Sequence, residues 1–476
     1  MSLQNILILI ASALLIRIVF PGKRRQWALL VVSILAIYWL QPALPIRNMD
    51  FWLPTATVGL IFLSWGLTSL KEQLLDPVNW LGAGLSLGTL LLIGLTRFVS
   101  LEGIITPTRP PQFYLVISAL LLIILSTFVL TLFSKPSPGL IWMGILVLLL
   151  VFIILKTPFL SLQGSIVLRR IMSQDPSLAK STDLGWLGFS YVSFRLIHTL
   201  IDRMKGRLNE IGLGELLVYT IFYPTVIAGP IDRLQRFRKD LLNPEPLSPG
   251  KMLQSGERLA VGLFRKFILA DALGLIAISG TNVTQVQSAG WLWLMLIAYA
   301  FQIFLDFAGY TDIAVGSGIL LGFRIPENFN QPYLKPNLTL FWNNWHMTLT
   351  QWIRSYFFFP ITRHLRRQGK LPAPLIILIT QMSTMLIIGL WHGITLNFVF
   401  WGTWHGLGLF IHNRWSAIVG PKVSKITAGK PFMTLIFKVS GMCLTFLFVS
   451  LGWVWFALPT TGSALITFAR LFGLGS

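Results

Sequence analysis

The chain has 476 residues, of which 54% are hydrophobic and only 12% are charged, and its mean hydropathy is +0.71. A soluble domain carries roughly 25% charged residues, so this composition excludes an ordinary soluble globular protein. The formal net charge of +21 suits basic loops that stay in the cytoplasm and attract anionic lipid headgroups. It also suits an electropositive entrance for a polyanionic ligand. The charges flank apolar segments and form no groove-reading motif, so nucleic acid is not an expected partner.

Apolar runs close to the roughly 20 residues that a helix needs to cross a bilayer recur along the chain. Examples are residues 6–20, 27–44, 113–133, 140–155, 291–305, 375–390 and 435–458. By this criterion the chain has on the order of eleven to thirteen membrane segments. The runs are too long and unbroken for tilted barrel strands, and helices satisfy their own backbone polar groups in lipid. The predicted fold class is therefore an all-α, polytopic transmembrane helix bundle.

The first apolar run does not resemble a cleaved signal peptide. No charge precedes it, and the basic residues Lys23, Arg24 and Arg25 follow it. Basic residues resist translocation, so this cluster is predicted to be cytoplasmic and the N-terminus outside, in a multi-pass protein of the plasma (inner) membrane. The single cysteine, Cys443, excludes a disulfide within the chain and does not indicate a redox compartment.

Three regions differ in composition. Residues 1–155 are apolar segments joined by short, Pro-rich links, and we interpret them as an N-terminal transmembrane scaffold. In residues 156–415, polar, aromatic and glycine residues interrupt the apolar runs, and ionisable groups near a membrane usually mark a functional cavity. Residues 416–476 form a basic loop and closing helices. The interruptions lie on one side of the chain only, whereas an inverted-repeat transporter has broken helices in both halves.

Residues 330–370 are Asn- and Trp-rich at first and then basic. This pattern predicts amphipathic helices that lie in the membrane interface and form a funnel toward the membrane interior. Trp342, Trp345 and Trp352 are expected at headgroup level.

All six histidines fall in residues 156–415, and three of them directly follow a tryptophan. A lone histidine in a helical membrane protein is more often a hydrogen-bonded structural residue than a catalyst. No His-x-x-x-His pair and no cysteine cluster occurs, so no metal site is expected. His392 is the exception, because it ends an apolar run and precedes Gly393. We therefore expect a proton acceptor with a pKa near neutrality at or near the membrane interior. The neighbouring glycine has no side chain, so another molecule can approach closely there.

Five blocks of sequence, in order between residues 185 and 415, resemble the membrane-bound O-acyltransferase family. The most specific are the Trp-His-Gly block within residues 389–406 and the Trp-Asn-Asn-Trp-His block within residues 341–356. The others are residues 223–233, 306–312 and 326–330. The two histidines that mark the family correspond to His392, which is usually taken as catalytic, and His346, whose role is less certain.

The resemblance implies transfer of an acyl group from a thioester to a hydroxyl. It implies no bound cofactor, an acyl-coenzyme A or acyl-carrier thioester as donor, and a cell-envelope polysaccharide as acceptor, reached through an extracytoplasmic partner protein. The pair Asp232 and Arg233 is similar to the branch that transfers D-alanine from a carrier to teichoic acid, whereas residues 306–312 and 326–330 fit the branch that acetylates polysaccharides. We expect O-acetylation, and D-alanyl transfer stays open. A transporter of envelope lipid or polysaccharide with a histidine proton relay, or a structural membrane subunit, are the alternatives from other classes.

A hydroxyl that attacks a thioester must lose its proton, and a histidine general base assists such a step by roughly 10²–10⁴-fold. We assign this role to His392, because no Gly-x-Ser-x-Gly motif occurs and Cys443 lies far away in the sequence. An acyl-histidine intermediate stays open.

Supporting roles are expected for Trp345, Trp391, Asn344, Asp306, Asp312 and Arg354. Each has an ordinary structural explanation as well: packing for the tryptophans, turns and caps for the asparagine and the aspartates, and a positive-inside flank for the arginine.

Overall fold

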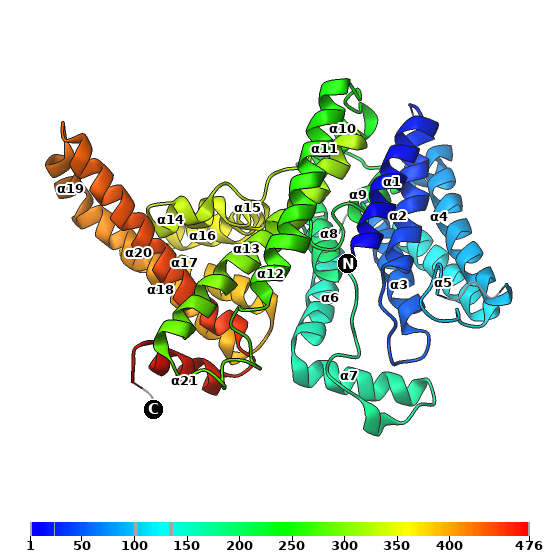
Figure 1. Cartoon of the computed structure of the whole chain (residues 1–476). Helices are drawn as coiled ribbons and strands as arrows, with labels where there is room; N and C mark the ends of the chain where they lie inside the picture. The colour runs from blue at the N-terminus through cyan, green and yellow to red at the C-terminus, as the bar shows by residue number, and fades with distance from the viewer. Residues whose placement is uncertain (1, 23, 100–102, 133–136, 475–476) are drawn as a thin grey trace. The chain divides into compact units, whose positions relative to one another are not determined.

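The computed structural model describes residues 2–22, 24–99, 103–132 and 137–474 (Figure 1). Within these residues the chain is helical and contains no β-strand, which confirms the predicted all-α membrane fold. Lys23, one of the three basic residues after the first apolar run, lies outside the described residues. The chain forms two compact units, the first from Met1–Ala260 with Asp312–Pro326 and the second from Val261–Thr311 with Glu327–Ser476. The three regions that we expect from composition, residues 1–155, 156–415 and 416–476, divide the chain along its sequence rather than by contacts. They stay a prediction.

The first unit begins with the helices α1 (Leu3–Val19), α2 (Arg24–Trp39), α3 (Met49–Gly66), α4 (Pro77–Leu95), α5 (Phe113–Leu132) and α6 (Pro138–Lys156). It continues with α7 (Pro158–Ile171), α8 (Phe189–Met204), α9 (Leu213–Thr220), α10 (Leu234–Leu242) and most of α11 (Pro249–Phe264). Three 3-10 turns, Lys71–Leu75, Thr96–Phe98 and Pro176–Leu178, connect them.

The second unit contains α12 (Asp271–Gly274), most of α13 (Ala289–Leu320), α14 (Leu338–Asn344), α15 (Met347–Ile353) and α16 (Phe359–Gln368). These are followed by α17 (Ala373–His392), α18 (Leu396–Ile418), α19 (Gly420–Thr427), α20 (Pro431–Ala457) and α21 (Thr461–Leu471). Its short elements are the 3-10 turn Pro332–Leu334 and the π-helical turns Arg265–Ala270 and Arg354–Phe358.

Six helices among the described residues are long and apolar enough to cross a membrane, namely α4 with its 3-10 extension, α5, α6, α13, α17 and α20. Only 11% of the most apolar part of α20 and 17% of that of α6 is buried inside the protein. Apolar surface left exposed in this way is what contact with lipid requires. The apolar runs predicted more membrane segments than these six, on the order of eleven to thirteen. That larger number counts shorter helices such as α1, and it stays a prediction.

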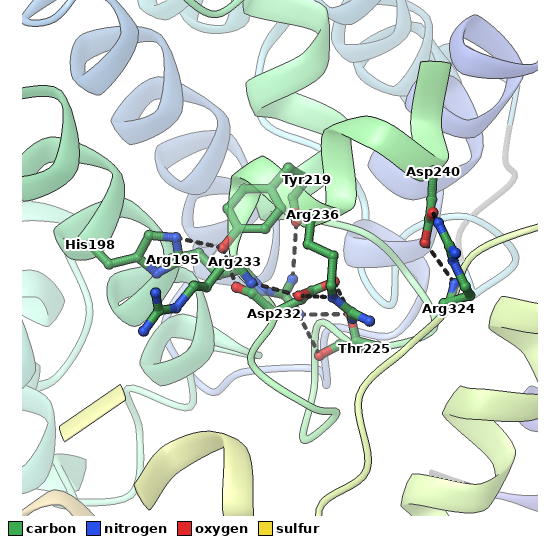
Figure 2. Close-up of polar contacts among 9 residues, drawn as sticks. All are labelled: Arg195, His198, Tyr219, Thr225, Asp232, Arg233, Arg236, Asp240 and Arg324. Atoms are coloured by element: carbon green, nitrogen blue, oxygen red, sulfur yellow. Dashed lines mark hydrogen bonds and ion pairs between the residues drawn. The ribbon is translucent and has the colours of Figure 1, made fainter. Parts of the chain in front are cut away.

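The start of α2 is anchored to two other segments of the first unit. The buried guanidinium of Arg25 donates to the carbonyl oxygens of Leu321 and, at 3.2 Å, of Asp240. The Asp240 carboxylate pairs with Arg324 at 2.6 Å (Figure 2). The start of α2, the end of α10 and the end of α13 therefore lie together in the first unit.

A second polar cluster of this unit holds α9 against α8 (Figure 2). Arg195 donates to the carbonyl oxygens of Tyr219 at 3.3 Å and Thr225 at 3.1 Å. Tyr219 lies in the last turn of α9, whose final carbonyls have no partner inside the helix, so this buried cation satisfies one of them. The Tyr219 hydroxyl donates to the Asp232 carbonyl oxygen at 2.7 Å and lies 2.9 Å from Nε2 of His198. These contacts place His198 and Asp232 in a structural network.

In the second unit, glycines bring the backbones of α17 and α18 close together. A Cβ on Gly402 would lie 2.7 Å from the carbonyl oxygen of Met385, and one on Gly389 would lie 2.3 Å from that of Phe398. Small residues at such positions allow helices to pack backbone to backbone in a membrane. This packing fixes the end of α17, where His392 lies, against α18.

Candidate active site

His346 lies between α14 and α15 in an unusual backbone conformation. It is the N-cap of α15, with φ 43° and ψ 53°, in the left-handed region. Residues other than glycine rarely adopt this region, and holding one there costs on the order of 1–3 kcal/mol. Strain of this kind concentrates at functional sites.

The ring of His346 is buried among aromatic residues and is 4% exposed. It packs edge-on against Phe307, with ring centroids 4.7 Å apart, and against Trp391, at 5.9 Å. Neither ring nitrogen has a hydrogen-bond partner in the described part of the chain. Burial lowers the pKa of His346 from 6.5 to about 3, because desolvation disfavours the charged imidazolium. The ring is therefore neutral at physiological pH, the form that accepts a hydrogen bond from a hydroxyl.

His392 is the last residue of α17 and is half-buried. Its ring lies 4.5 Å from that of Trp391, 4.7 Å from that of Phe456 and 5.8 Å from that of Trp401. Trp391 thus contacts both His392 and His346. The structure brings the two histidines expected to be catalytic to the same aromatic ring.

Sequence reasoning did not single out His405, the third histidine of this aromatic core. It is fully buried, and neither of its ring nitrogens has a partner within the described residues. Its ring lies 4.7 Å from that of Trp401 and 5.2 Å from that of Trp342. The repeated Trp-His pair at residues 404–405 was the available signal. Trp401 therefore contacts both His405 and His392.

A cavity of about 100 Å³ lies among α14, α15, α17 and α18. Three of its lining side chains have buried polar atoms without a hydrogen-bond partner among the described residues: Nε1 of Trp342, Oε1 of Gln381 and Oγ1 of Thr384. Buried polar groups almost always have a partner, so this cavity is suited to a polar ligand. Thr350, which also lines it, donates its backbone N–H to the His346 carbonyl oxygen at 3.0 Å.

Arg354, an expected supporting residue, lines the same cavity. It begins the π-helical turn between α15 and α16, and burial lowers the pKa of its guanidinium. The arginine therefore lines the same cavity as the unpartnered polar atoms of Gln381 and Thr384, so an anionic or polar group of a ligand bound there would offset its desolvation.

The two expected aspartates form ion pairs with basic residues. Asp306 pairs with Lys266 in the second unit, and Asp312 pairs with Arg258 at 2.7 Å in the first unit. The side chain of Asn344 donates to the carbonyl oxygen of Leu340 at 2.7 Å, a contact within its own helix. The structure thus shows a structural contact for each of these three residues.

Trp345 belongs to the aromatic core rather than to an exposed interface. Trp342 and Trp345 are each 5% exposed, and their expected depth at headgroup level stays a prediction. Trp345 stacks on Phe341 at 5.5 Å and packs against Trp453 at 5.2 Å. Trp342 packs against Trp401 of α18 at 5.7 Å, so both indoles are covered by other aromatic rings of the second unit.

The model of the membrane-bound O-acyltransferase family (MBOAT) matches residues 112–454. The chain is 33% identical over 290 residues to the "Probable alginate O-acetylase AlgI" of Pseudomonas syringae pv. tomato, which covers 61% of this chain and 52% of that protein. It is 32% identical over 240 residues to the teichoic acid D-alanyltransferase of Streptococcus thermophilus, covering 49% and 58%. It is 30% identical over 267 residues to the peptidoglycan O-acetyltransferase of Helicobacter pylori, covering 55% and 47%.

The matched region spans about half the length of these curated relatives. The match to the family model, residues 112–454, contains His346, His392 and the residues of the cavity. Since the family model covers most of the chain, this protein belongs to the membrane-bound O-acyltransferase family.

Proposed function

We propose that this protein transfers an acetyl group from a thioester donor to hydroxyls of a cell-envelope polysaccharide. The observation that carries the proposal is the meeting of His346 and His392 on Trp391, inside the region that matches the acyltransferase family. The relatives named as alginate O-acetylase and peptidoglycan O-acetyltransferase support acetyl as the acyl group and a polysaccharide as the acceptor.

His392 acts as the general base. It takes the proton of the acceptor hydroxyl as the oxygen attacks the thioester carbonyl carbon, so that a C–O bond forms and the C–S bond breaks. The proton then passes to the leaving sulfur, which restores neutral histidine and releases a free thiol. Such assistance contributes roughly 10²–10⁴-fold, and the surrounding aromatic rings limit hydrolysis of the thioester by excluding water. His346, with its neutral ring, orients the acceptor hydroxyl or the thioester carbonyl region of the substrates.

The donor is an acyl-coenzyme A or an acyl-carrier protein, both of which present the thioester on a pantetheine arm. The amides of such an arm suit the unpartnered atoms of Trp342, Gln381 and Thr384 in the cavity. Arg354 beside them attracts negative charge. Arg363, Arg366 and Arg367 are exposed on α16, where they raise the local concentration of donor phosphates.

In this proposal the protein lies in the plasma (inner) membrane with its N-terminus outside. Basic residues stay in the cytoplasm, and Arg25 ties the ends of α10 and α13 to the start of α2. The acyl group is then delivered to an acceptor outside the membrane, with an extracytoplasmic partner protein presenting the polysaccharide.

D-alanyl transfer is the second candidate, because of the similarity to the teichoic acid D-alanyltransferase.

Membranes that contain the protein are supplied either with [¹⁴C]acetyl-coenzyme A or with a D-[¹⁴C]alanyl-carrier thioester, and alkali-labile label in the polysaccharide fraction is counted. Label from acetyl-coenzyme A in the wild type, but not in His392→Gln, supports the proposal. Label from the D-alanyl donor alone selects the second candidate. Absence of label from both donors, with transport of an envelope lipid intact, would contradict acyl transfer.

A further inference from the structure

The left-handed turn at His346 needs support from outside its own helix. The first N–H groups of a helix lack partners within it, and the side chain of the N-cap residue usually accepts from one of them. His346 is the N-cap of α15, and its side chain makes no such bond. Its ring is instead turned toward Phe307 and Trp391.

Asn328 supplies the missing cap from a different part of the chain. Its carbonyl oxygen accepts the Met347 N–H at 2.9 Å, and its Oδ1 accepts the Thr348 hydroxyl at 2.6 Å and the Thr348 N–H at 3.4 Å. The backbone and the side chain of Asn328 thereby hold Met347 and Thr348, the two residues that directly follow His346. Asn328 is fully buried, so these bonds are sheltered from water.

Asn328 also connects this turn to α13. Its Nδ2 donates to Oγ1 of Thr311 at 3.4 Å, and the Thr311 hydroxyl donates to the carbonyl oxygen of Phe307 at 3.0 Å. Phe307 is the residue whose ring packs edge-on against His346. One asparagine therefore fixes both the backbone that follows His346 and the helix that carries a wall of its ring pocket.

We propose that Asn328 is a positioning residue for catalysis, which caps α15 in place of His346 and keeps the imidazole of His346 free and correctly aimed. The inference rests on the proposed acyl transfer at His346 and His392. The amide oxygen of Asn328 accepts from α15, and its amide nitrogen donates to Thr311 of α13. An asparagine at this buried position therefore has a partner for each end of its amide group.

The test uses two ways of breaking the cap in the full-length protein in membranes. Asn328→Ala removes the side chain, and Thr348→Val removes the hydroxyl that donates to it while preserving shape. Thr348→Ser keeps that hydroxyl, and Asn330→Ala makes the same change at an exposed side chain two residues away. With [¹⁴C]acetyl-coenzyme A as donor, we expect kcat to fall roughly 10-fold to 100-fold in the first two variants. The donor KM should stay the same, and the two controls should match the wild type.

Two further readouts separate positioning from general damage. In a His346→Gln background, Asn328→Ala should cause no additional fall in kcat, because the asparagine acts through His346. The rate at which diethyl pyrocarbonate modifies His346, followed by mass spectrometry, should rise in Asn328→Ala because the ring is released. An unchanged modification rate, or an equal fall in kcat in both backgrounds, would overturn the inference. If His346→Gln alone keeps the wild-type kcat, the catalytic role of His346 fails, and the modification rate still decides whether Asn328 holds the ring.

Discussion

The ring of Trp391 packs against the ring of His346 with centroids 5.9 Å apart and an interplanar angle of 68°. Because Trp391 is the residue directly before His392, this contact couples the end of α17 to the left-handed turn before α15. The two histidines belong to one aromatic site, and each is expected to respond to substitution in its own way.

His392→Gln should lower kcat by roughly 10²–10⁴-fold, since a general base is removed. The donor KM should change little, because the lost interaction is made mainly in the transition state. The measurement is acyl transfer by the purified protein, together with its elution profile and thermal stability. His412→Gln is the matched control, because His412 lies on α18 and bonds Thr339 and Ser416. Near-normal transfer by well-folded His392→Gln would remove His392 from the mechanism.

Gln381→Leu should raise the donor KM roughly 10-fold without loss of stability. The glutamine oxygen has no partner among the described residues, and an unsatisfied buried polar atom costs about 1–3 kcal/mol. The thermal midpoint is therefore expected to stay the same or rise, while binding of the donor amides weakens. Gln351→Leu makes the same change at an exposed position of α15. A lower midpoint with an unchanged KM would show that Gln381 has a structural role only.

Replacing Arg363, Arg366 and Arg367 together by glutamine should raise the donor KM roughly 10-fold at low salt, because these exposed charges attract donor phosphates. The effect should shrink at high salt, where the charges are screened. The control replaces Lys422 and Lys425, two exposed lysines on the short helix α19. If expression falls and the KM holds, the arginines serve only to orient the chain in the membrane.

The stability of the protein should fall as the pH is lowered from 6.5 toward 3, in part because of His346. Its pKa in the folded protein is lowered to about 3 from 6.5, so in this window the unfolded chain binds one more proton than the folded one. Such a group contributes up to about 1.4 kcal/mol per pH unit to the slope. His346→Gln should flatten the dependence of the thermal midpoint on pH, whereas exposed His364→Gln should not. An unchanged slope in His346→Gln would mean that this ring is not buried and neutral.

A cysteine at Ser2 should react with an impermeant thiol reagent added outside whole cells, and one at Asn243 should not. Asn243 is exposed and follows Asp240, whose carbonyl oxygen accepts from Arg25 at the start of α2, the end that we propose to be cytoplasmic. The native Cys443 is exposed and is first replaced by serine. The reverse labelling pattern would overturn the orientation.

The helical fold could be predicted, because apolar runs are local features of the sequence. The Trp-His blocks are local too and led to His346 and His392, whose catalytic roles stay a prediction. The backbone of His346 could not, because Trp345 and Met347 beside it give no turn signal and the cap comes from Asn328. Twenty residues separate Asn328 from Thr348, which it binds, and forty separate Lys266 from Asp306. Packing was expected for Trp345, but the rings that bury Trp342 and Trp345 could not be named, since the exposure of a tryptophan depends on which helices pack against it.

The left-handed conformation of His346 limits what selection can place at this position. Glycine would relax the turn and discard the functional group, whereas asparagine, which tolerates this conformation better than most residues, would relax it and keep a hydrogen-bonding amide. Histidine tolerates this backbone conformation less well than either glycine or asparagine. An asparagine at position 346 would therefore relax the backbone and still offer a hydrogen bond to a substrate, so the fold should tolerate this replacement better than the geometry of the site does.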